Sequence, residues 1–261
     1  MRSEIATSVL FASGAVAQAA GCSPLHLVYA RATTEPPASY SEGAFDTAAA
    51  RTWSKGYGAA GMSLLTNVTA LIPGATGYPV HYPASFVGDS SSQGVANMVK
   101  ELTEKSKACP SMKFAIGGHS QGGFVTTGSI PKLPADVLKK VVAVTMFGAP
   151  ECPASVADRC VSYCNTGDSV CDKRGSGSAG AAKGGKGRGK GKGAPSGEMV
   201  EAEVEERKVK RAPAMIEAAP DCAKYASIQT SGLGSGGHLG YNKDGTYTRA
   251  AACYILAKFK A

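Results

Sequence analysis

The sequence has few of the residues that suit a membrane span or a nucleic-acid interface. Aromatic residues make up 7% of the 261 residues, with a single Trp, and there are only four histidines. The apolar run at residues 5–17 is too short to cross a bilayer, and Thr7, Ser8 and Ser13 also make it too polar. The four histidines leave a short list of candidates for a general base.

Most of the net positive charge lies in a single segment. The net charge is +8, and residues 173–211 contain eleven Lys or Arg and five Glu, so they carry +6 and leave +2 for the rest. The basic segment has no aromatic residue on which bases could stack. Nucleic acid is therefore not an expected partner. The segment is interpreted as a solvated loop insertion, and a polyanion-binding tail is the alternative.

The eight cysteines indicate an oxidising compartment. Ala17-Gln18-Ala19 follows the apolar run and matches a signal-peptidase pattern, so residues 1–19 are expected to be a secretory signal and the mature protein to be extracellular. A frayed N-terminal helix is the other interpretation. The cysteine spacings resemble no zinc finger, and no metal is expected.

Strand-like and helix-like segments alternate along the chain. This alternation predicts an α/β fold, a three-layer α/β/α sandwich with a central, mainly parallel sheet. We expect one domain from residues 20–172 plus 212–261, and a disordered Gly/Lys-rich insertion at 173–211 whose charged end could be helical. The expected strands are 25–30, 77–83, 112–117, 141–147 and 159–164, and the expected helices are 53–71, 92–108 and 246–260.

The sharpest motif is Gly118-His119-Ser120-Gln121-Gly122, which follows an apolar strand-like run and precedes a helix-like one. This is the pattern of a nucleophile elbow, where a strained turn exposes the Ser120 hydroxyl. The glycines are needed because the turn leaves no room for side chains. The N–H of Gln121, at the start of a helix, can face a developing oxyanion.

A serine nucleophile needs a base and a group that orients the base. His26 lies in an expected buried strand, nothing marks His81 as catalytic, and His119 is expected to pack at the elbow. His238 lies in the Gly-rich stretch 231–241 just before the final helix, where it could reach the sheet edge. Asp168 lies in Cys164-Asn-Thr-Gly-Asp-Ser-Val-Cys171, after the last strand. The order Ser120, Asp168, His238 is that of α/β-hydrolases.

These stretches resemble the cutinase family of serine esterases, which includes acetylxylan esterases. The similar segments are 22 and 30–36, 77–84, 109–122, 147–150, 164–171 and 238–241. The resemblance implies Ser120 as nucleophile, His238 as base and Asp168 as its orienting acid. It also implies an oxyanion hole from Thr33 and Gln121, and disulfides Cys22–Cys109 and Cys164–Cys171.

The chain departs from the family's usual pattern at three places. Ala32 replaces a usual glycine, His119 replaces a usual tyrosine, and residues 173–211 stand where the family has a short loop. The four remaining cysteines allow three pairings. Among these, Cys152–Cys160 together with Cys222–Cys253 is favoured, because the second link would hold the stretch around His238 near the site.

The resemblance implies a secreted, monomeric esterase without a cofactor. Its substrates would be carboxylic esters, including polymers such as cutin or acetylated polysaccharide, or short-acyl esters, hydrolysed through an acyl-enzyme. The alternative from another class is a catalytically weak or inactive protein of the same fold. Such a protein would bind acidic polymers or surfaces through its basic Gly/Lys tract.

Overall fold

The structure, a computed structural model, describes residues 21–37, 43–149, 151–171 and 218–261. The expected signal segment at 1–19 and the expected insertion at 173–211 lie outside the described residues. The domain boundaries expected at residues 172 and 212 lie outside them too. Among the described helices, none is both long enough and apolar enough to cross a membrane.

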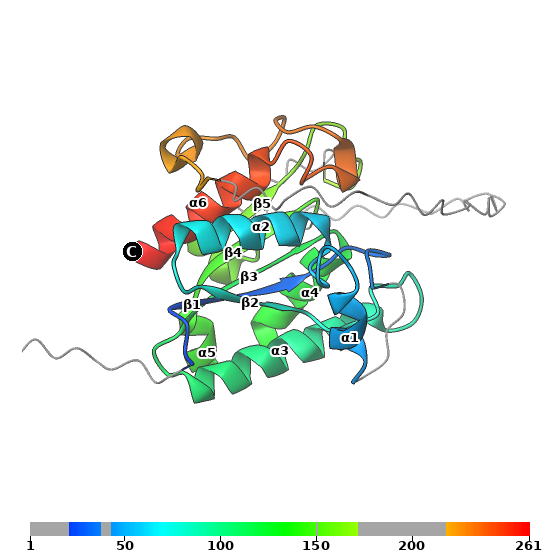
Figure 1. The fold of residues 1–261 in the computed structure, drawn as a ribbon, viewed down its shortest axis with the longest axis vertical. Helices are drawn as coiled ribbons and strands as arrows, with labels where there is room; N and C mark the ends of the chain where they lie inside the picture. The colour runs from blue at the N-terminus through cyan, green and yellow to red at the C-terminus, as the bar shows by residue number, and fades with distance from the viewer. Residues whose placement is uncertain (1–20, 38–42, 150, 172–217) are drawn as a thin grey trace, which may run out of the picture.

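A five-stranded sheet forms the centre of the described part (Figure 1). Its order is β2-β1-β3-β4-β5, and every neighbouring pair is parallel. Parallel strands require crossover connections, which the intervening helices supply. The strands are β1 (Leu25–Ala30), β2 (Thr76–Pro79), β3 (Lys113–His119), β4 (Val141–Phe147) and β5 (Cys160–Tyr163).

Helices cover both faces of this sheet. Figure 1 shows α2 (Gly58–Leu71) and α6 (Thr246–Lys260) on one face. On the other face lie α3 (Ser90–Ala108), α4 (Gln121–Ser129) and α5 (Ala135–Lys140). The expected three-layer α/β/α sandwich is thus confirmed. The short elements are α1 (Phe45–Ala50), η1 (Ile130–Lys132), η2 (Ala154–Arg159), η3 (Cys222–Tyr225) and η4 (Gly237–Leu239).

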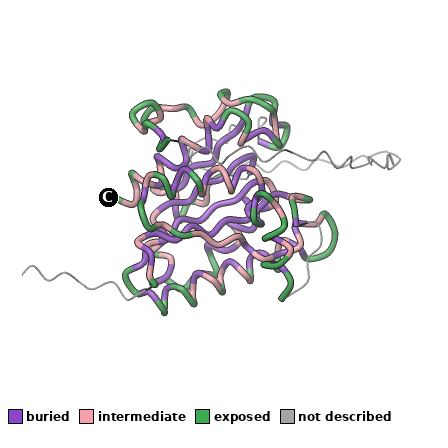
Figure 2. Tube along the Cα trace, in the orientation of Figure 1, coloured by how far each residue is buried: buried purple, intermediate pink, exposed green. Residues whose placement is uncertain are grey.

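Two apolar cores lie on opposite sides of the sheet, because successive strand residues point to opposite faces. On β1, Leu25, Leu27 and Tyr29 pack in the core shared with α2 and α6. Val28 and Ala30 pack in the core that contains residues of α3, α4 and α5. All six residues of β1 are buried, as expected for a central strand covered on both faces (Figure 2).

Some element boundaries differ from those expected. The helix expected at 53–71 begins only at residue 58, because Lys55 and Gly56 have φ values of 47° and 85°, which no right-handed helix accepts. The strand expected at 77–83 is shorter, at 76–79. The short helices α1 and α5 were not predicted.

Four disulfides link all eight cysteines. Two of them, Cys22–Cys109 and Cys164–Cys171, are those that the resemblance implies. The other two, Cys152–Cys160 and Cys222–Cys253, are the pairs that the sequence favoured. A disulfide framework of this density fits an oxidising environment.

Candidate active site

Ser120 lies between β3 and α4 at the carboxyl edge of the sheet. Its backbone φ of 54° and ψ of −118° lie in a region that non-glycine residues rarely adopt. The Ser120 N–H donates to the carbonyl of Phe147 on β4, at 3.0 Å, which holds the turn against the neighbouring strand. Such strain in an over-determined turn is typical of functional positions.

Both glycines of the elbow motif are required by close backbone contacts. A Cβ atom at position 118 would lie 2.2 Å from the carbonyl oxygen of Gly122. A Cβ atom at position 122 would lie 2.0 Å from the carbonyl oxygen of Ala30 on β1. The first turn of α4 therefore sits directly on the ends of β1 and β3.

Asp168 and His238 form a hydrogen-bonded pair. The Nδ1 atom of His238 lies 2.9 Å from Oδ1 and 3.0 Å from Oδ2 of Asp168. The carboxylate is fully buried and also accepts hydrogen bonds from the Tyr241 hydroxyl at 2.6 Å and the Val170 N–H at 2.9 Å. Burial alone would raise the pKa of Asp168, but these hydrogen bonds lower it below its usual value. The carboxylate is thus held as an anion.

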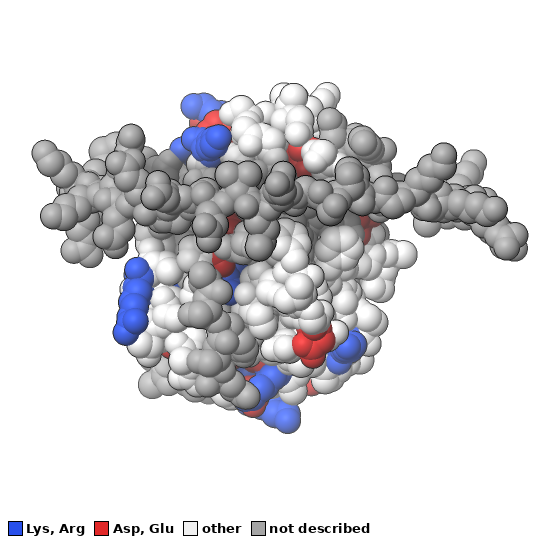
Figure 3. Space-filling view, turned by 90° about the vertical axis from the view of Figure 1, so that its right-hand side faces the viewer, with Lys and Arg blue, Asp and Glu red and all other residues white. Residues whose placement is uncertain are grey.

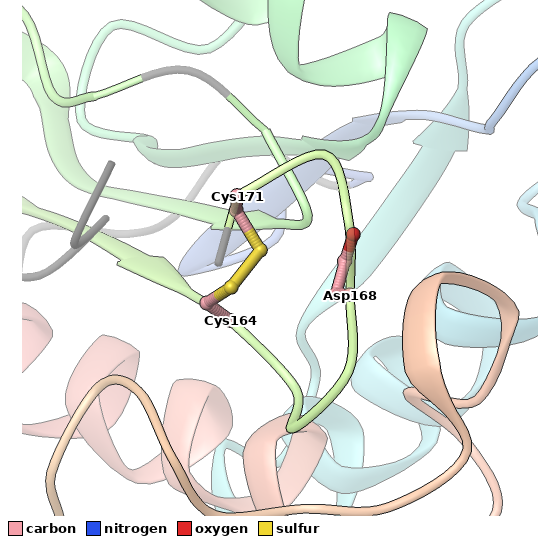
Figure 4. A group of neighbouring side chains, drawn as sticks. All are labelled: Cys164, Asp168 and Cys171. Carbon is pink, nitrogen blue, oxygen red and sulfur yellow. A yellow bond between two sulfur atoms is a disulfide. The ribbon is translucent and has the colours of Figure 1, made fainter. Parts of the chain in front are cut away.

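A disulfide closes the loop that carries Asp168. Figure 4 shows the Cys164–Cys171 bond at the base of this loop, with Asp168 on the far arm. Cys164, Asp168 and Cys171 lie close enough together to suggest a binding site for one metal ion. However, the two sulfur atoms are bonded to each other, so they are not thiolate ligands. The cluster is therefore a braced loop and not a metal centre.

The segment that carries His238 is anchored to the acid loop and to α6. The Asn165 side-chain amide donates to the carbonyls of Ser235 and Gly237, at 3.3 and 3.0 Å. The N–H of Leu233 donates to the hydroxyl of Tyr247 at 3.0 Å. The Cys222–Cys253 disulfide ties the chain that precedes this segment to α6.

His238 also lies beside the elbow. Its ring is 4.9 Å from the ring of His119, the residue before Ser120. The Ser120 hydroxyl makes no hydrogen bond among the described residues. Asp168 contacts His238 directly, and His238 contacts the elbow through His119, the residue next to Ser120. Gly148, just after β4, leaves space for the His238 ring, since a Cβ atom there would lie 2.9 Å from His238 Nδ1.

The two expected oxyanion-hole residues lie in separate segments of the chain. Gln121 begins α4, and its side-chain amide donates to Ser85 at 2.9 Å. Thr33 lies in the loop 31–37, where the N–H of Ala32 donates to the carboxylate of Glu35 at 2.7 Å. Ala32 is not among the residues with positive φ, so alanine occupies the usual glycine position without backbone strain.

The remaining histidines have structural partners, as the sequence indicated for His26. Its ring nitrogens bond Thr76 at 2.7 Å and Glu101 at 3.0 Å. His81 stacks between the rings of Phe45 and Tyr78, at centroid distances of 4.2 and 4.7 Å. His119 is buried at the elbow.

Some residues of the site were not singled out from the sequence. Tyr241 and Glu35 both lie within segments that resemble the family, and this resemblance could have marked them as candidates. Their hydrogen-bond partners depend on the fold and could not be predicted from the sequence. Asn165 lies inside the acid loop and was likewise not singled out. Outside the site, Asn67 of the sequon Asn67-Val68-Thr69 is buried in the folded chain, and its side-chain amide donates to the carbonyl of Ser63.

The surface around the elbow carries exposed apolar side chains. Phe86 and Val87 follow Ser85, which contacts Gln121, and they are 83% and 78% exposed. Leu239 follows His238 and is 69% exposed. Phe124, in α4, is also exposed. Figure 3 views the molecule from the carboxyl edge of the sheet, and the described residues that are visible there carry only scattered charges.

Comparison with known proteins gives one consistent result. A family model described as Cutinase matches residues 21–182. A cutinase of Kineococcus radiotolerans is 30% identical over 173 residues, covering 59% of this chain and 53% of that protein. A cutinase of Botryotinia fuckeliana is 31% identical over 168 residues, covering 63% and 77%. A cutinase of Hypocrea jecorina is 33% identical over 116 residues, covering 42% and 46%.

The chain spans about half the length of the Kineococcus and Hypocrea relatives. Among solved structures, a Trichoderma reesei cutinase in complex with a phosphonate inhibitor has 27% identity and a TM-score of 0.45, covering 57% of this chain and 64% of that one. An acetylxylan esterase has 19% identity and a TM-score of 0.47, covering 91% and 99%. Because the family model spans more than half of the chain, the protein belongs to the cutinase family.

Proposed function

We propose that this protein is a carboxylic ester hydrolase that uses Ser120 as nucleophile, His238 as general base and Asp168 as the acid that orients it. The observation that carries the proposal is the Asp168–His238 pair, at 2.9 Å, next to a strained serine elbow. Membership of the cutinase family supports the same reaction class. The four disulfides support a secreted enzyme.

In the proposed reaction, His238 Nε2 removes the hydroxyl proton while Ser120 Oγ attacks the ester carbonyl carbon. The Nδ1–H donates to Asp168, which remains ionised and stabilises the imidazolium. Gln121 and Thr33 would donate to the oxyanion of the tetrahedral intermediate. When the intermediate collapses, the alcohol leaves with the proton from His238. Water activated by His238 then releases the acid from the acyl-enzyme.

The exposed apolar side chains around the elbow support esters with an accessible apolar acyl group or polymer surface as substrates. Phe86, Val87 and Leu239 could contact such a substrate without first moving. Cutin-like polyester and short-acyl esters both meet this description. A series of p-nitrophenyl esters of increasing acyl length would separate them, because kcat/KM compares the transition-state binding of each acyl chain.

The proposal is tested by hydrolysis of a short p-nitrophenyl ester by wild type and by Ser120→Ala. We expect wild-type activity that the variant loses. Activity that survives in Ser120→Ala would reject Ser120 as nucleophile. A folded wild type without activity would instead favour the non-catalytic alternative.

A further inference from the structure

His119 links the elbow to the segment that carries the proposed base. Its Nε2 atom lies 2.7 Å from the backbone carbonyl oxygen of His238. A carbonyl can only accept a hydrogen bond, so Nε2 carries the proton. The His119 side chain is 3% exposed, and its ring also contacts the ring of Tyr241 at 5.2 Å.

We propose that His119 is a positioning residue, whose Nε2–H holds the backbone of His238 at the elbow and so sets the base beside Ser120. This inference rests on the proposed esterase function. His119 itself does not touch the reacting atoms in this scheme. It acts through the main chain of His238.

The hydrogen bond matters because of where the other anchors end. In the 231–241 segment, Asn165 holds the carbonyls of Ser235 and Gly237 from one side. His119 holds the next carbonyl, that of His238, from β3 on the other side. Asp168 orients the imidazole ring, whereas His119 fixes the main chain from which the ring projects. A misplacement of about 1 Å at this point can cost about 100-fold in rate.

His119 is suited to this role because it stays neutral. Burial, with a smaller effect from the nearby His238, lowers the pKa of His119 to about 4. The other charged or titratable groups around it are the Asp168 carboxylate, the Tyr241 hydroxyl and the Glu35 carboxylate, whose Oε2 lies 4.0 Å from Nδ1. A neutral ring keeps a single donor on Nε2 at neutral pH and adds no second positive charge beside His238 when His238 takes up a proton.

The Nδ1 atom of His119 is buried and has no hydrogen-bond partner among the described residues. The 4.0 Å separation from Glu35 is too long for a hydrogen bond. The donor on Nε2 is therefore the polar contact through which this side chain acts. A side chain that supplies only that donor should replace it.

A matched pair of variants tests this directly. His119→Gln keeps an N–H₂ donor at a similar distance from the backbone, whereas His119→Met has similar length and no donor. With a short p-nitrophenyl ester, we expect His119→Met to lower kcat about 10- to 100-fold, with KM within about twofold of wild type. His119→Gln should recover most of the loss. Equal losses in both variants, or wild-type kcat in His119→Met, would overturn the proposal.

Hydrogen–deuterium exchange gives a readout that does not depend on activity. In His119→Met, backbone amides of residues 231–241 should exchange faster than in wild type, and in His119→Gln they should not. Unchanged exchange in His119→Met would refute the tether, even in a preparation without esterase activity. Loss of the proposed function would instead appear as an inactive wild type with this exchange difference intact.

His26→Met controls for the loss of a buried histidine. His26 is 4% exposed and bonds Thr76 and Glu101 away from the site. We expect it to unfold at lower urea concentration than wild type with kcat unchanged. If His119→Met does not fold, His119→Asn replaces it. The Asn side chain is one carbon shorter than that of Gln, so its amide donor does not reach as far toward the His238 carbonyl. His119→Asn should then fall below His119→Gln in kcat, and equal values would overturn the proposal.

Discussion

At the scale of single residues, the Asp168 carboxylate is supported by groups that lie far apart in the sequence. Tyr241, which donates to it, is 73 residues away. Ser120, Asp168 and His238 could be picked out from the sequence because each lies in a recognisable local pattern. Tyr241, Glu35 and the donor role of His119 could not, because a local pattern carries no information about a partner from another part of the chain.

Asp168→Asn should lower kcat about 10³- to 10⁴-fold, because the amide no longer holds His238 in the tautomer that accepts the serine proton. A pKa below the usual value means that the ionised carboxylate stabilises the fold above its unfolded-state pKa, and that this stabilisation is lost as pH falls through the folded-state pKa. The variant should therefore be less stable than wild type at pH 7, by about 1–3 kcal/mol.

Urea unfolding at pH 7 and at about pH 3, a unit below the ordinary Asp pKa, checks this prediction, since the gap in free energy should narrow at the lower pH. Asp158→Asn is the control, because the Asp158 side chain is 72% exposed and should leave kcat unchanged. A stability gap of equal size at both values would contradict the assignment of Asp168 as a stabilising anion.

Glu35 has the opposite sign of pH dependence. Burial raises the pKa of Glu35, although the N–H groups of Ala32 and Ala59 counter part of this effect. Ionisation is thus more costly in the folded state, so wild type should lose stability relative to Glu35→Gln as pH rises from the usual Glu pKa through the raised one. Urea unfolding of both proteins between pH 4 and pH 8 measures this difference. Parallel pH profiles would show that Glu35 titrates normally in the folded protein.

At the scale of elements, the junction of β1, β3 and α4 sets the position of the elbow. The motif indicated the β3–α4 part of this junction correctly from the sequence, since a strand, a serine turn and a helix follow in that order. The contact with β1 was not predicted. The predicted start of α2 was wrong, because apolar spacing alone does not reveal the positive φ angles at Lys55 and Gly56. The helix α5 is only six residues long, too short to give a clear periodic signal.

Gly122→Ala tests this junction. The added carbon would meet the backbone of Ala30 at 2.0 Å, where neither α4 nor β1 can yield without moving. We expect a loss of about 1–3 kcal/mol in the free energy of unfolding, with reduced activity. Gly128→Ala, in the same helix, would meet only the tip of Val95 at 3.1 Å and should be close to neutral. Equal stability of the two variants, measured in urea, would rule out the close contact.

At the scale of the whole molecule, the fold brings Asp168 and His238 together across a long interval of sequence. The alternation of strands and helices predicted the three-layer sandwich correctly. The disulfide between Cys222 and Cys253, which ties the chain before His238 to α6, belongs to the pairing that the sequence analysis favoured among three. Spacing alone allowed all three pairings, because it does not show which cysteines approach each other in space.

Replacing Cys222 and Cys253 by Ser should lower stability and activity together. The bond closes a loop of 31 residues, for which the chain-entropy model gives about 3–4 kcal/mol. The Cys152–Cys160 bond spans only 8 residues and does not involve the His238 segment, so its double Ser variant should lose less stability and keep kcat. Thermal unfolding and ester hydrolysis of both variants check this. Equal effects on kcat would argue against a role of the first bond in holding the base.

The central claim is that Ser120 is activated by His238 and Asp168, and covalent trapping tests it most directly. A phosphonate ester with an activated leaving group should modify the protein once, and tandem mass spectrometry should place the adduct on Ser120. We predict that Asp168→Asn and His238→Gln slow this modification at least about 100-fold, because the serine loses its base. An adduct on another residue, or modification of Ser120 at the same rate in all three proteins, would contradict the account.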